Sequence, residues 1–230
     1  MASWSQSQRL ETVLDVIRAE GARSVLDLGC GDGDLLVQLA AEAGIERIVG
    51  IDLCRKTLDR AQARLAASLD GQLEPGPGPG PIARARVELV HDSFMETGER
   101  FRGFDCAALV ETIEHIEPQR LSVLERAVFD SMRPATVVIT TPNAELNPFL
   151  DVPDHRFRHP DHRFEWDRAK FSSWSEGVAR RNDYRVACST LAGRHPRFGG
   201  ATQMAVFRRE HVRRDPFTRD QLPRDQSKAP

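Results

Sequence analysis

The sequence has no long apolar run. None of its hydrophobic stretches approaches the roughly 20 residues that a helix needs to cross a bilayer, and its first residues, MASWSQSQRL, lack the charged-then-apolar pattern of a secretory signal. We therefore expect a soluble, cytoplasmic protein with no membrane partner.

Cysteine is scarce and scattered. The four cysteines, Cys30, Cys54, Cys106 and Cys188, form no CxxC pair. This spacing argues against a cysteine zinc site and against a disulfide framework, so reduced thiols are expected.

Length and composition predict one globular domain. The 230 residues are 40% hydrophobic and 29% charged, which is enough apolar content for a single core. We expect a catalytic domain over residues 1–209 and a disordered tail over 210–230.

The net charge of -2 conceals an acidic excess before residue 150 and a basic excess after it. The basic part could face an anion such as RNA, although basic surfaces commonly serve only solubility.

Strand and helix patterns alternate along the chain. Short runs rich in branched apolar residues predict buried parallel strands at 24–28, 47–51, 87–91, 106–110 and 136–140. Helical patterns cover 10–17, 34–43, 55–69, 118–132 and 167–181, and two further strands are expected near 184–190 and 202–208. The alternation predicts an α/β fold with a doubly wound sheet. The Gly/Pro-rich segment 74–82 is expected to be a flexible connection within that sheet.

A glycine-rich turn follows the first predicted strand. The segment VLDLGCGDGDLL places Gly29 and Gly31 where missing side chains let backbone amides approach a ligand, with Asp27 just ahead of them. The spacing differs from the pyrophosphate fingerprint and resembles a methyltransferase motif. S-adenosylmethionine has no phosphate and carries a sulfonium and an ammonium, so a nearby carboxylate suits it.

Acidic residues also follow the next two strands. Asp52 comes about twenty residues after the glycines, where a carboxylate can accept hydrogen bonds from both ribose hydroxyls. Asp92 and Ser93 follow the third strand, at the position that meets the adenine amine in class I methyltransferases. Helix capping or turn formation is the alternative reading of these aspartates, but three at successive strand ends favour a cofactor site.

A second cluster of polar residues follows the fourth strand. The stretch VETIEHIEP holds Glu111, Glu114 and His115 within five residues. Two carboxylates this close repel each other or take up protons unless a cation joins them. Methyltransferases of small molecules carry a similar stretch, so the motif alone leaves the acceptor open.

Three segments give the chain a family resemblance. In ETIEH, TTPNAELNPF and DHRFEW it resembles the small-RNA 3′-terminal ribose 2′-O-methyltransferases, the Hua-enhancer family, and the likeness covers nearly the whole chain. The resemblance implies a class I methyltransferase fold, a Rossmann-like seven-stranded sheet that is mostly parallel with an antiparallel last strand. It also implies S-adenosyl-L-methionine as methyl donor and a Mn²⁺ or Mg²⁺ ion held by Glu111, Glu114, His115 and His162, with His159 as the alternative to His162.

The resemblance also implies a substrate and partners. The ion would bind both hydroxyls of an RNA 3′ end, single-stranded or in a duplex, and an RNA-repair or RNA-silencing protein is the candidate partner of a monomeric enzyme. Such an ion would lower the pKa of the reacting hydroxyl. Two other readings stay open: metal-free methylation of a small hydroxylated or amino metabolite, and a non-catalytic RNA-binding or adaptor protein.

The loop before the last helix carries further candidates. Phe164 and Trp166 could stack on a base, although anchoring of the loop to the core is the more common role and is favoured for Trp166. Three arginines could neutralise phosphates, namely Arg156, Arg158 and Arg163.

Overall fold

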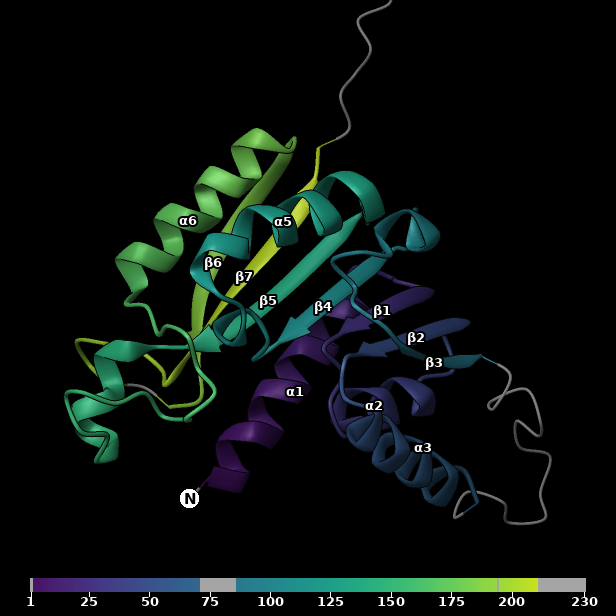
Figure 1. Ribbon diagram of the computed structural model, residues 1–230, viewed down its shortest axis with the longest axis horizontal. Coiled ribbons are helices and arrows are strands. Elements are labelled where there is room, and N and C mark those ends of the chain that lie inside the picture. The colour runs from purple at the N-terminus through teal and green to yellow at the C-terminus, as the bar shows by residue number, and fades with distance from the viewer. Residues whose placement is uncertain (1, 71–85, 194, 211–230) are drawn as a thin grey trace, which may run out of the picture.

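Seven strands form a single sheet in a computed structural model that describes residues 2–70, 86–193 and 195–210 (Figure 1). The strand order is β3-β2-β1-β4-β5-β7-β6. Strands β1 to β5 are parallel, and β7 runs antiparallel to both of its neighbours, β5 and β6. The predicted doubly wound sheet with one antiparallel strand is therefore confirmed. The strands are β1 (Ser24–Leu28), β2 (Arg47–Asp52), β3 (Val87–His91), β4 (Cys106–Val110), β5 (Thr136–Pro142), β6 (Tyr184–Leu191) and β7 (Thr202–Arg209).

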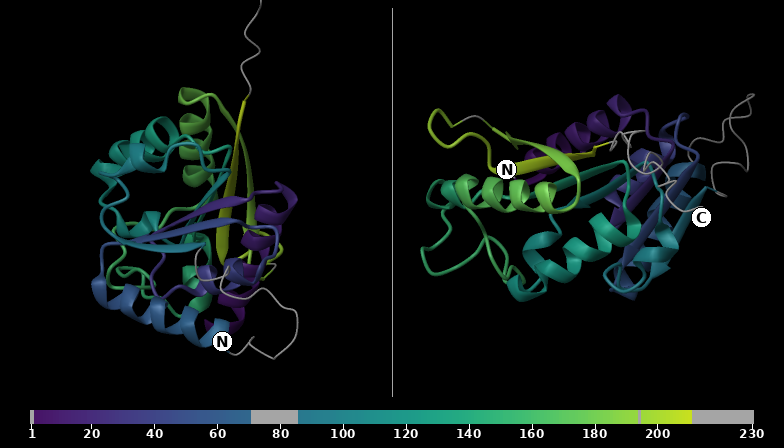
Figure 2. Two further views of the ribbon diagram at one scale, coloured as in Figure 1. Left: turned by 90° about the vertical axis from the view of Figure 1, so that its right-hand side faces the viewer. Right: turned by 90° about the horizontal axis from the view of Figure 1, so that it is seen from above.

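Helices cover both faces of the sheet, as Figures 1 and 2 show. Helices α1 (Ala2–Ala19), α2 (Asp34–Ala41) and α3 (Arg55–Asp70) pack on one face, and α5 (Leu121–Glu125) and α6 (Arg168–Arg181) pack on the other. Neighbouring residues of β5 belong to different cores, since Val138 packs with the first group and Val137 with the second. Burial on both faces explains why the parallel strands are continuous apolar runs in the sequence.

The helix expected over 118–132 changes pitch along its length. A 3₁₀ turn at Pro118–Arg120 leads into α5, and a π-helical segment follows at Arg126–Met132. The wider turn ends with the amide of Arg133 donating to the carbonyl of Val128 at 3.0 Å. Because an apolar pattern shows which side of a helix is buried and not its hydrogen-bond spacing, this change was not visible in the sequence.

Several predicted boundaries shift by a few residues. The first helix extends to Ala2–Ala19 around the predicted 10–17, and α2 ends at Ala41 instead of residue 43. Among the described helices, none is both long and apolar enough to span a membrane. The Gly/Pro-rich segment 74–82 and nearly all of the predicted tail, 211–230, lie outside the described residues.

The sheet topology determines where a ligand can bind. Strands β1 and β4 are neighbours, while the connections from β1 and β4 lead to strands on opposite sides of that pair. The carboxyl ends of parallel strands around such a switch point border a crevice. Beyond the same edge, β5 continues into a 3₁₀ helix, η5 (Ala144–Leu150), and then into residues 151–166, which contain neither helix nor strand.

Candidate functional site: a cofactor cavity beside a carboxylate and histidine cluster

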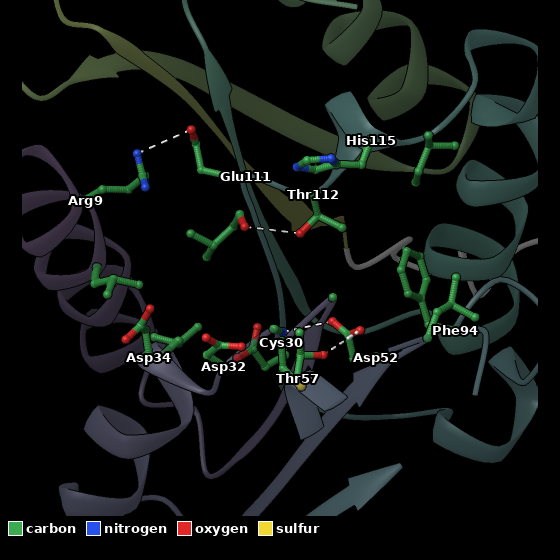
Figure 3. Close-up of a pocket in the computed structure, with 18 of the residues that line it drawn as sticks. Arg9, Cys30, Asp32, Asp34, Asp52, Thr57, Phe94, Glu111, Thr112 and His115 are labelled. Atoms are coloured by element: carbon green, nitrogen blue, oxygen red, sulfur yellow. Dashed lines mark hydrogen bonds and ion pairs between the residues drawn. The ribbon is translucent and has the colours of Figure 1, made fainter. Parts of the chain in front are cut away.

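A cavity of about 560 Å³ opens at the carboxyl ends of β1, β2 and β4. Its volume lies within the range typical of small-molecule sites. Figure 3 shows side chains from these strand ends and from α1 around it. Seven residues predicted for the two sites line it, namely Asp27, Gly29, Gly31, Asp52, Ser93, Glu111 and His115.

The glycine turn after β1 depends on two glycines for different reasons. Both Gly29 and Gly31 have positive φ angles, 79° and 51°. A Cβ at Gly29 would lie 2.6 Å from Cγ2 of Thr112, so the segment that follows β4 packs directly against this turn. A Cβ at Gly31 would meet nothing within 4 Å, and Gly31 lines the cavity. The turn thus leaves open space for a ligand next to its backbone.

Asp52 links the end of β2 to the glycine turn. Its Oδ2 accepts the amide of Gly31 at 2.9 Å, and its Oδ1 accepts the amide of Cys54 at 2.7 Å. The carboxylate is thereby oriented at the cavity wall before any ligand binds. This position is compatible with the predicted role toward ribose hydroxyls.

Asp27 is a buried acid without a hydrogen-bond partner on one oxygen. The residue is 2% exposed, and its Oδ2 has no partner among the described residues. Burial raises the pKa of Asp27 to about 7, and the charges of Asp52 and Asp34 add to the effect. A ligand ammonium would supply both the missing donor and the missing positive charge.

Asp92 departs from the expected position. It is not among the lining residues, and its Oδ1 accepts the amide of Ser93 at 2.7 Å, so it shapes the turn after β3. Ser93 lines the cavity together with Phe94 and Met95. The apolar pair offers a surface for an adenine ring, and sequence reasoning missed both residues because they follow the strand as ordinary core-type residues.

Glu111 and Glu114 form the second part of the site. Glu111 follows β4 with a φ of 50°, and its amide donates to the carbonyl of Thr140 at 3.1 Å. Glu114 is 0% exposed and accepts the hydroxyl of Thr141 at 3.0 Å through Oε2. The Oε1 atom of each glutamate is buried without a hydrogen-bond partner in the described structure.

The two carboxylates disfavour each other's charge. Burial raises the pKa of Glu114 well above its ordinary value, and the neighbouring charge of Glu111 raises it further. Burial also raises the pKa of Glu111, against the opposing effect of Arg9. A bound cation would reverse this situation because it stabilises both ionised carboxylates.

Three histidines gather beside these glutamates. Candidate ligand nitrogens of His115, His159 and His162 all lie within 4.8 Å of one another, and the rings of His115 and His162 are 4.9 Å apart between centroids. Burial lowers the pKa of His115, and the other two histidines lower it further. A neutral imidazole keeps a lone pair for a metal ion. Both predicted histidines are therefore together, and His159 joins them.

A network of buried hydrogen bonds holds the histidine loop against the glutamates. The amide of Arg163 donates to the carbonyl of Glu114 at 2.7 Å. Arg158 donates through Nε to Oδ1 of Asn147 and through Nη1 to the carbonyl of Ala201, both at 2.7 Å. The expectation that Arg158 contacts phosphate is therefore wrong, because its guanidinium is committed to holding the loop.

The aromatic pair of the loop serves packing. Phe164 and Trp166 are both buried, and their rings stack at 4.2 Å. The amide nitrogen of the Gln203 side chain donates to the carbonyl of Trp166 at 2.7 Å, which fastens the loop to β7. The anchoring role favoured for Trp166 is confirmed, whereas Phe164 is not available to stack on a base.

Two functional candidates were missed in the sequence. Arg9 reaches from α1 into the cavity, and its Nη1 lies 3.3 Å from Oε2 of Glu111. Glu165 lies behind His162, with its Oε1 2.5 Å from the ring Nδ1. The sequence contained a signal for Glu165, a carboxylate three residues after a histidine, and none for Arg9, which is more than one hundred residues from its partner.

The residues present fit both groups that the sequence analysis implied. The unpartnered Asp27 oxygen and the open space at Gly31 suit an amino-acid nucleoside such as S-adenosylmethionine. The buried, unpartnered oxygens of Glu111 and Glu114 and the nitrogens of the histidine cluster are the oxygen and nitrogen ligand types that a divalent transition metal accepts.

Sheet order, glycine turn and cavity together define a class I methyltransferase, and comparison with known proteins agrees. The family described as "Methyltransferase domain" matches residues 5–217, so the chain belongs to that family and its methyl donor is S-adenosylmethionine. Within it, the chain belongs to the Hen1 or Hua-enhancer group, whose resemblance the motifs had indicated.

Individual relatives support this placement. The small RNA 2′-O-methyltransferase of Gallus gallus is 36% identical over 223 residues, which is 95% of this chain and 56% of that protein. The crystal structure of the methyltransferase domain of bacterial CtHen1 superposes with a TM-score of 0.76 at 35% identity, covering 89% of this chain and 99% of that one. The structure of small RNA methyltransferase HEN1 has a TM-score of 0.79 at 31% identity, over 90% of this chain and 25% of that one.

The chain spans about half the length of the curated relatives that it matches. What those longer proteins act on therefore enters below as a proposal.

Proposed function

We propose that this protein methylates the 2′-hydroxyl of the 3′-terminal nucleotide of small RNAs, with S-adenosylmethionine as donor and with Mn²⁺ or Mg²⁺ bound by Glu111, Glu114, His115 and His162. Its similarity to proteins named small RNA 2′-O-methyltransferases supports the reaction and the substrate class. Metal dependence is supported by the chemistry of the cluster alone.

One observation supports the metal more than any other. Glu111 and Glu114 each keep a buried oxygen without a hydrogen-bond partner among the described residues. The loop that carries His159 and His162 is hydrogen bonded to the backbone of Glu114, and candidate ligand nitrogens of these two histidines and His115 lie within 4.8 Å of one another. Glu111 is paired with Arg9, whereas Glu114 has no ion pair among the described residues. Burial of a charge without compensation is unfavourable. A divalent cation is the ligand that compensates both carboxylates at once.

The cluster is continuous with the cofactor cavity. Glu111 and His115 line the cavity and also belong to the proposed ligand set. A divalent ion held there would lower the pKa of a ribose hydroxyl and so favour its attack on a methyl group. The glutamates and histidines would orient the ribose, and Asp27, Asp52 and the glycine turn would hold the donor. Recognition of two vicinal hydroxyls would select RNA over DNA without reading sequence.

The direct experiment measures transfer of radiolabelled methyl groups to a short RNA, with and without a chelator. The same assay includes matching DNA, 3′-phosphorylated RNA and RNA whose terminal diol has been oxidised with periodate. We expect methylation of unmodified RNA only, lost with chelator and regained with Mn²⁺ or Mg²⁺.

Each control removes one part of the proposal. Unimpaired methylation of the oxidised RNA would exclude recognition of the terminal ribose. Full activity in chelator would exclude the metal while leaving the RNA substrate in place. Methylation of a small metabolite in preference to RNA would support the alternative acceptor class.

A further inference from the structure

Arg9 bridges the two parts of the site. It reaches from α1 to Glu111, with Nη1 3.3 Å from Oε2, and the arginine side chain is 16% exposed. The same Nη1 lies 3.3 Å from the hydroxyl of Thr202, while the buried Nε has no partner among the described residues. Figure 3 shows the ion pair at one end of the cavity, above the acidic residues that follow β1 and β2.

The cavity wall is strongly acidic apart from this arginine. Five carboxylates line it, those of Asp27, Asp32, Asp34, Asp52 and Glu111. Among the described lining residues Arg9 is the one that carries a guanidinium or a lysine ammonium. S-adenosylmethionine has an ammonium, which suits Asp27, but also a carboxylate, which an acidic wall disfavours. Asp32 and Asp34 are paired with Arg60 and Arg64, whereas Asp27 and Asp52 have no ion pair among the described residues. Arg9 is the lining group whose charge and geometry suit a carboxylate.

Arg9 also occupies one carboxylate oxygen of a proposed metal ligand. Its partner Glu111 belongs to the proposed ligand set, and the ion pair uses Oε2 while Oε1 is unpartnered. An arginine bound to Glu111 brings positive charge to the edge of the metal site and repels an incoming cation. The apo protein thus holds Glu111 with an internal cation.

Resting on the proposed function, we infer that Arg9 exchanges partners. Without ligands it pairs with Glu111, and when the cofactor binds it turns to the carboxylate of the cofactor, which frees Glu111 for the divalent ion. Cofactor and metal then favour each other's binding, and thermodynamic linkage requires the effect to be equal in both directions.

The test uses isothermal titration calorimetry on the full chain, with S-adenosylhomocysteine and Mn²⁺ as probes. A second nucleoside, S-adenosyl-3-thiopropylamine, keeps the ammonium and lacks the carboxylate. We expect S-adenosylhomocysteine to raise the Mn²⁺ affinity at least about 5-fold, and the decarboxylated analogue to leave it unchanged. This comparison needs no substitution and so is independent of folding.

Substitutions then assign the effect to Arg9. In Arg9→Gln, S-adenosylhomocysteine should bind about 10- to 100-fold more weakly, the loss of one charged hydrogen-bonded pair, while the decarboxylated analogue binds as before. The Mn²⁺ affinity of the cofactor-free protein should rise, because Glu111 is released. Arg9→Lys should keep part of the coupling. The matched control is Arg18→Gln on the same helix, α1, which breaks an ion pair with Glu42 at the end of α2, and neither residue lines the cavity.

Two results would overturn the exchange. One is an unchanged Mn²⁺ affinity in the presence of S-adenosylhomocysteine, and the other is an Arg9→Gln variant that weakens both nucleosides alike. If the wild-type protein methylates RNA in a metal-dependent way but shows no coupling, the exchange fails and the proposed function stands. If no Mn²⁺ binds under any condition, both the metal and the exchange fail.

Discussion

The imidazole of His162 is hydrogen bonded to the carboxylate of Glu165, with 2.5 Å between Nδ1 and Oε1. The two side chains are 8% and 1% exposed. Burial acts to raise the pKa of Glu165, but hydrogen bonds from His162, Asn147 and the amide of Arg158 outweigh it, so the net pKa is lowered. Because Glu165 is then ionised at neutral pH, it accepts a hydrogen bond from Nδ1, and Nε2 is the ring nitrogen left to face a metal.

Removing this support should weaken metal binding without touching the cofactor. We expect Glu165→Ala to lower Mn²⁺ affinity about 10- to 100-fold, and Glu165→Gln to lower it less, because the amide oxygen still accepts from Nδ1. Titration of Mn²⁺ followed by electron paramagnetic resonance measures the effect. Glu117→Gln is the control, since this exposed glutamate pairs with Arg163 of the same loop. Equal losses in the Glu117 and Glu165 variants would argue against orientation of His162.

Glu114→Gln should raise the stability of the metal-free protein while it impairs the metal site. The substitution removes a buried carboxyl group whose pKa is raised by burial and by the charge of Glu111. The new amide can keep the hydrogen bond from Thr141. The metal-free variant should therefore melt several degrees higher than the wild type at pH 8, where about 1 kcal/mol corresponds to roughly 2–4 °C. Methyl transfer should be lost while S-adenosylhomocysteine binding persists. A variant that melts lower and retains activity would contradict the assignment.

Loss of His162 should reduce methyl transfer more than loss of His159. His162→Ala should abolish metal-dependent methyl transfer, whereas His159→Ala should reduce it less than about 10-fold, because the His159 side chain is 54% exposed and lacks a buried carboxylate behind it. Both variants should bind S-adenosylhomocysteine normally in calorimetry. The reverse order of effects would identify His159 as the ligand in place of His162.

The sheet could be predicted closely because its strands are buried on both faces. β1, β3 and β4 have the predicted limits, since each is a short branched run between polar turns. The π-helical pitch of Arg126–Met132 could not be predicted, because Val128, Phe129 and Met132 are buried in either geometry. A local sequence pattern thus predicts which face of a helix or strand is buried more reliably than it predicts the spacing of the backbone hydrogen bonds.

Prediction of the site succeeded where the residues were neighbours in sequence. Asp27 lies near the end of β1, and Glu111 and His115 follow β4, its neighbour in the sheet, so the topology alone brings them to the cavity. Assignment of His162 needed the family resemblance, because its place depends on a loop held by Arg158, which the sequence offered only as one of three candidates for phosphate contact. The position of Arg9 at the cavity depends on how α1 packs, which no local sequence pattern predicts.

Cofactor affinity should depend on the ionisation of Asp27. Its pKa is about 7 in the folded protein against an ordinary 3.8. The unfolded chain therefore ionises first, and stability of the apo protein falls as pH rises from about 4 to 7, by about 4 kcal/mol in all. Asp27→Asn should flatten this part of the stability curve and weaken S-adenosylhomocysteine about 10- to 100-fold at pH 8. Wild-type affinity should rise as pH increases through 7, measured by calorimetry. A pH-independent affinity would contradict contact between Asp27 and the ammonium.

The two glycines of the turn should respond differently to alanine. Gly29→Ala places Cβ 2.6 Å from Thr112 and strains a positive φ, so it should destabilise the protein by several kcal/mol. Gly31→Ala meets open space and should cost only about 1 kcal/mol, yet its methyl group lies next to the cavity and should weaken the cofactor at least about 10-fold. Urea unfolding together with calorimetry distinguishes the two. Equal stability losses would show that the space beside Gly31 is filled.

The left-handed backbone of Glu111 constrains how the enzyme can be redesigned. A φ of 50° is unusual for a residue with a side chain, and here it turns the chain sharply after β4 so that Glu111 and Glu114 share one side. Any change that relaxes this turn would displace both carboxylates at once. Attempts to broaden the range of acceptors should therefore leave 110–115 intact and vary the exposed positions 153–157, which belong neither to the histidine cluster nor to the side-chain hydrogen bonds of Arg158.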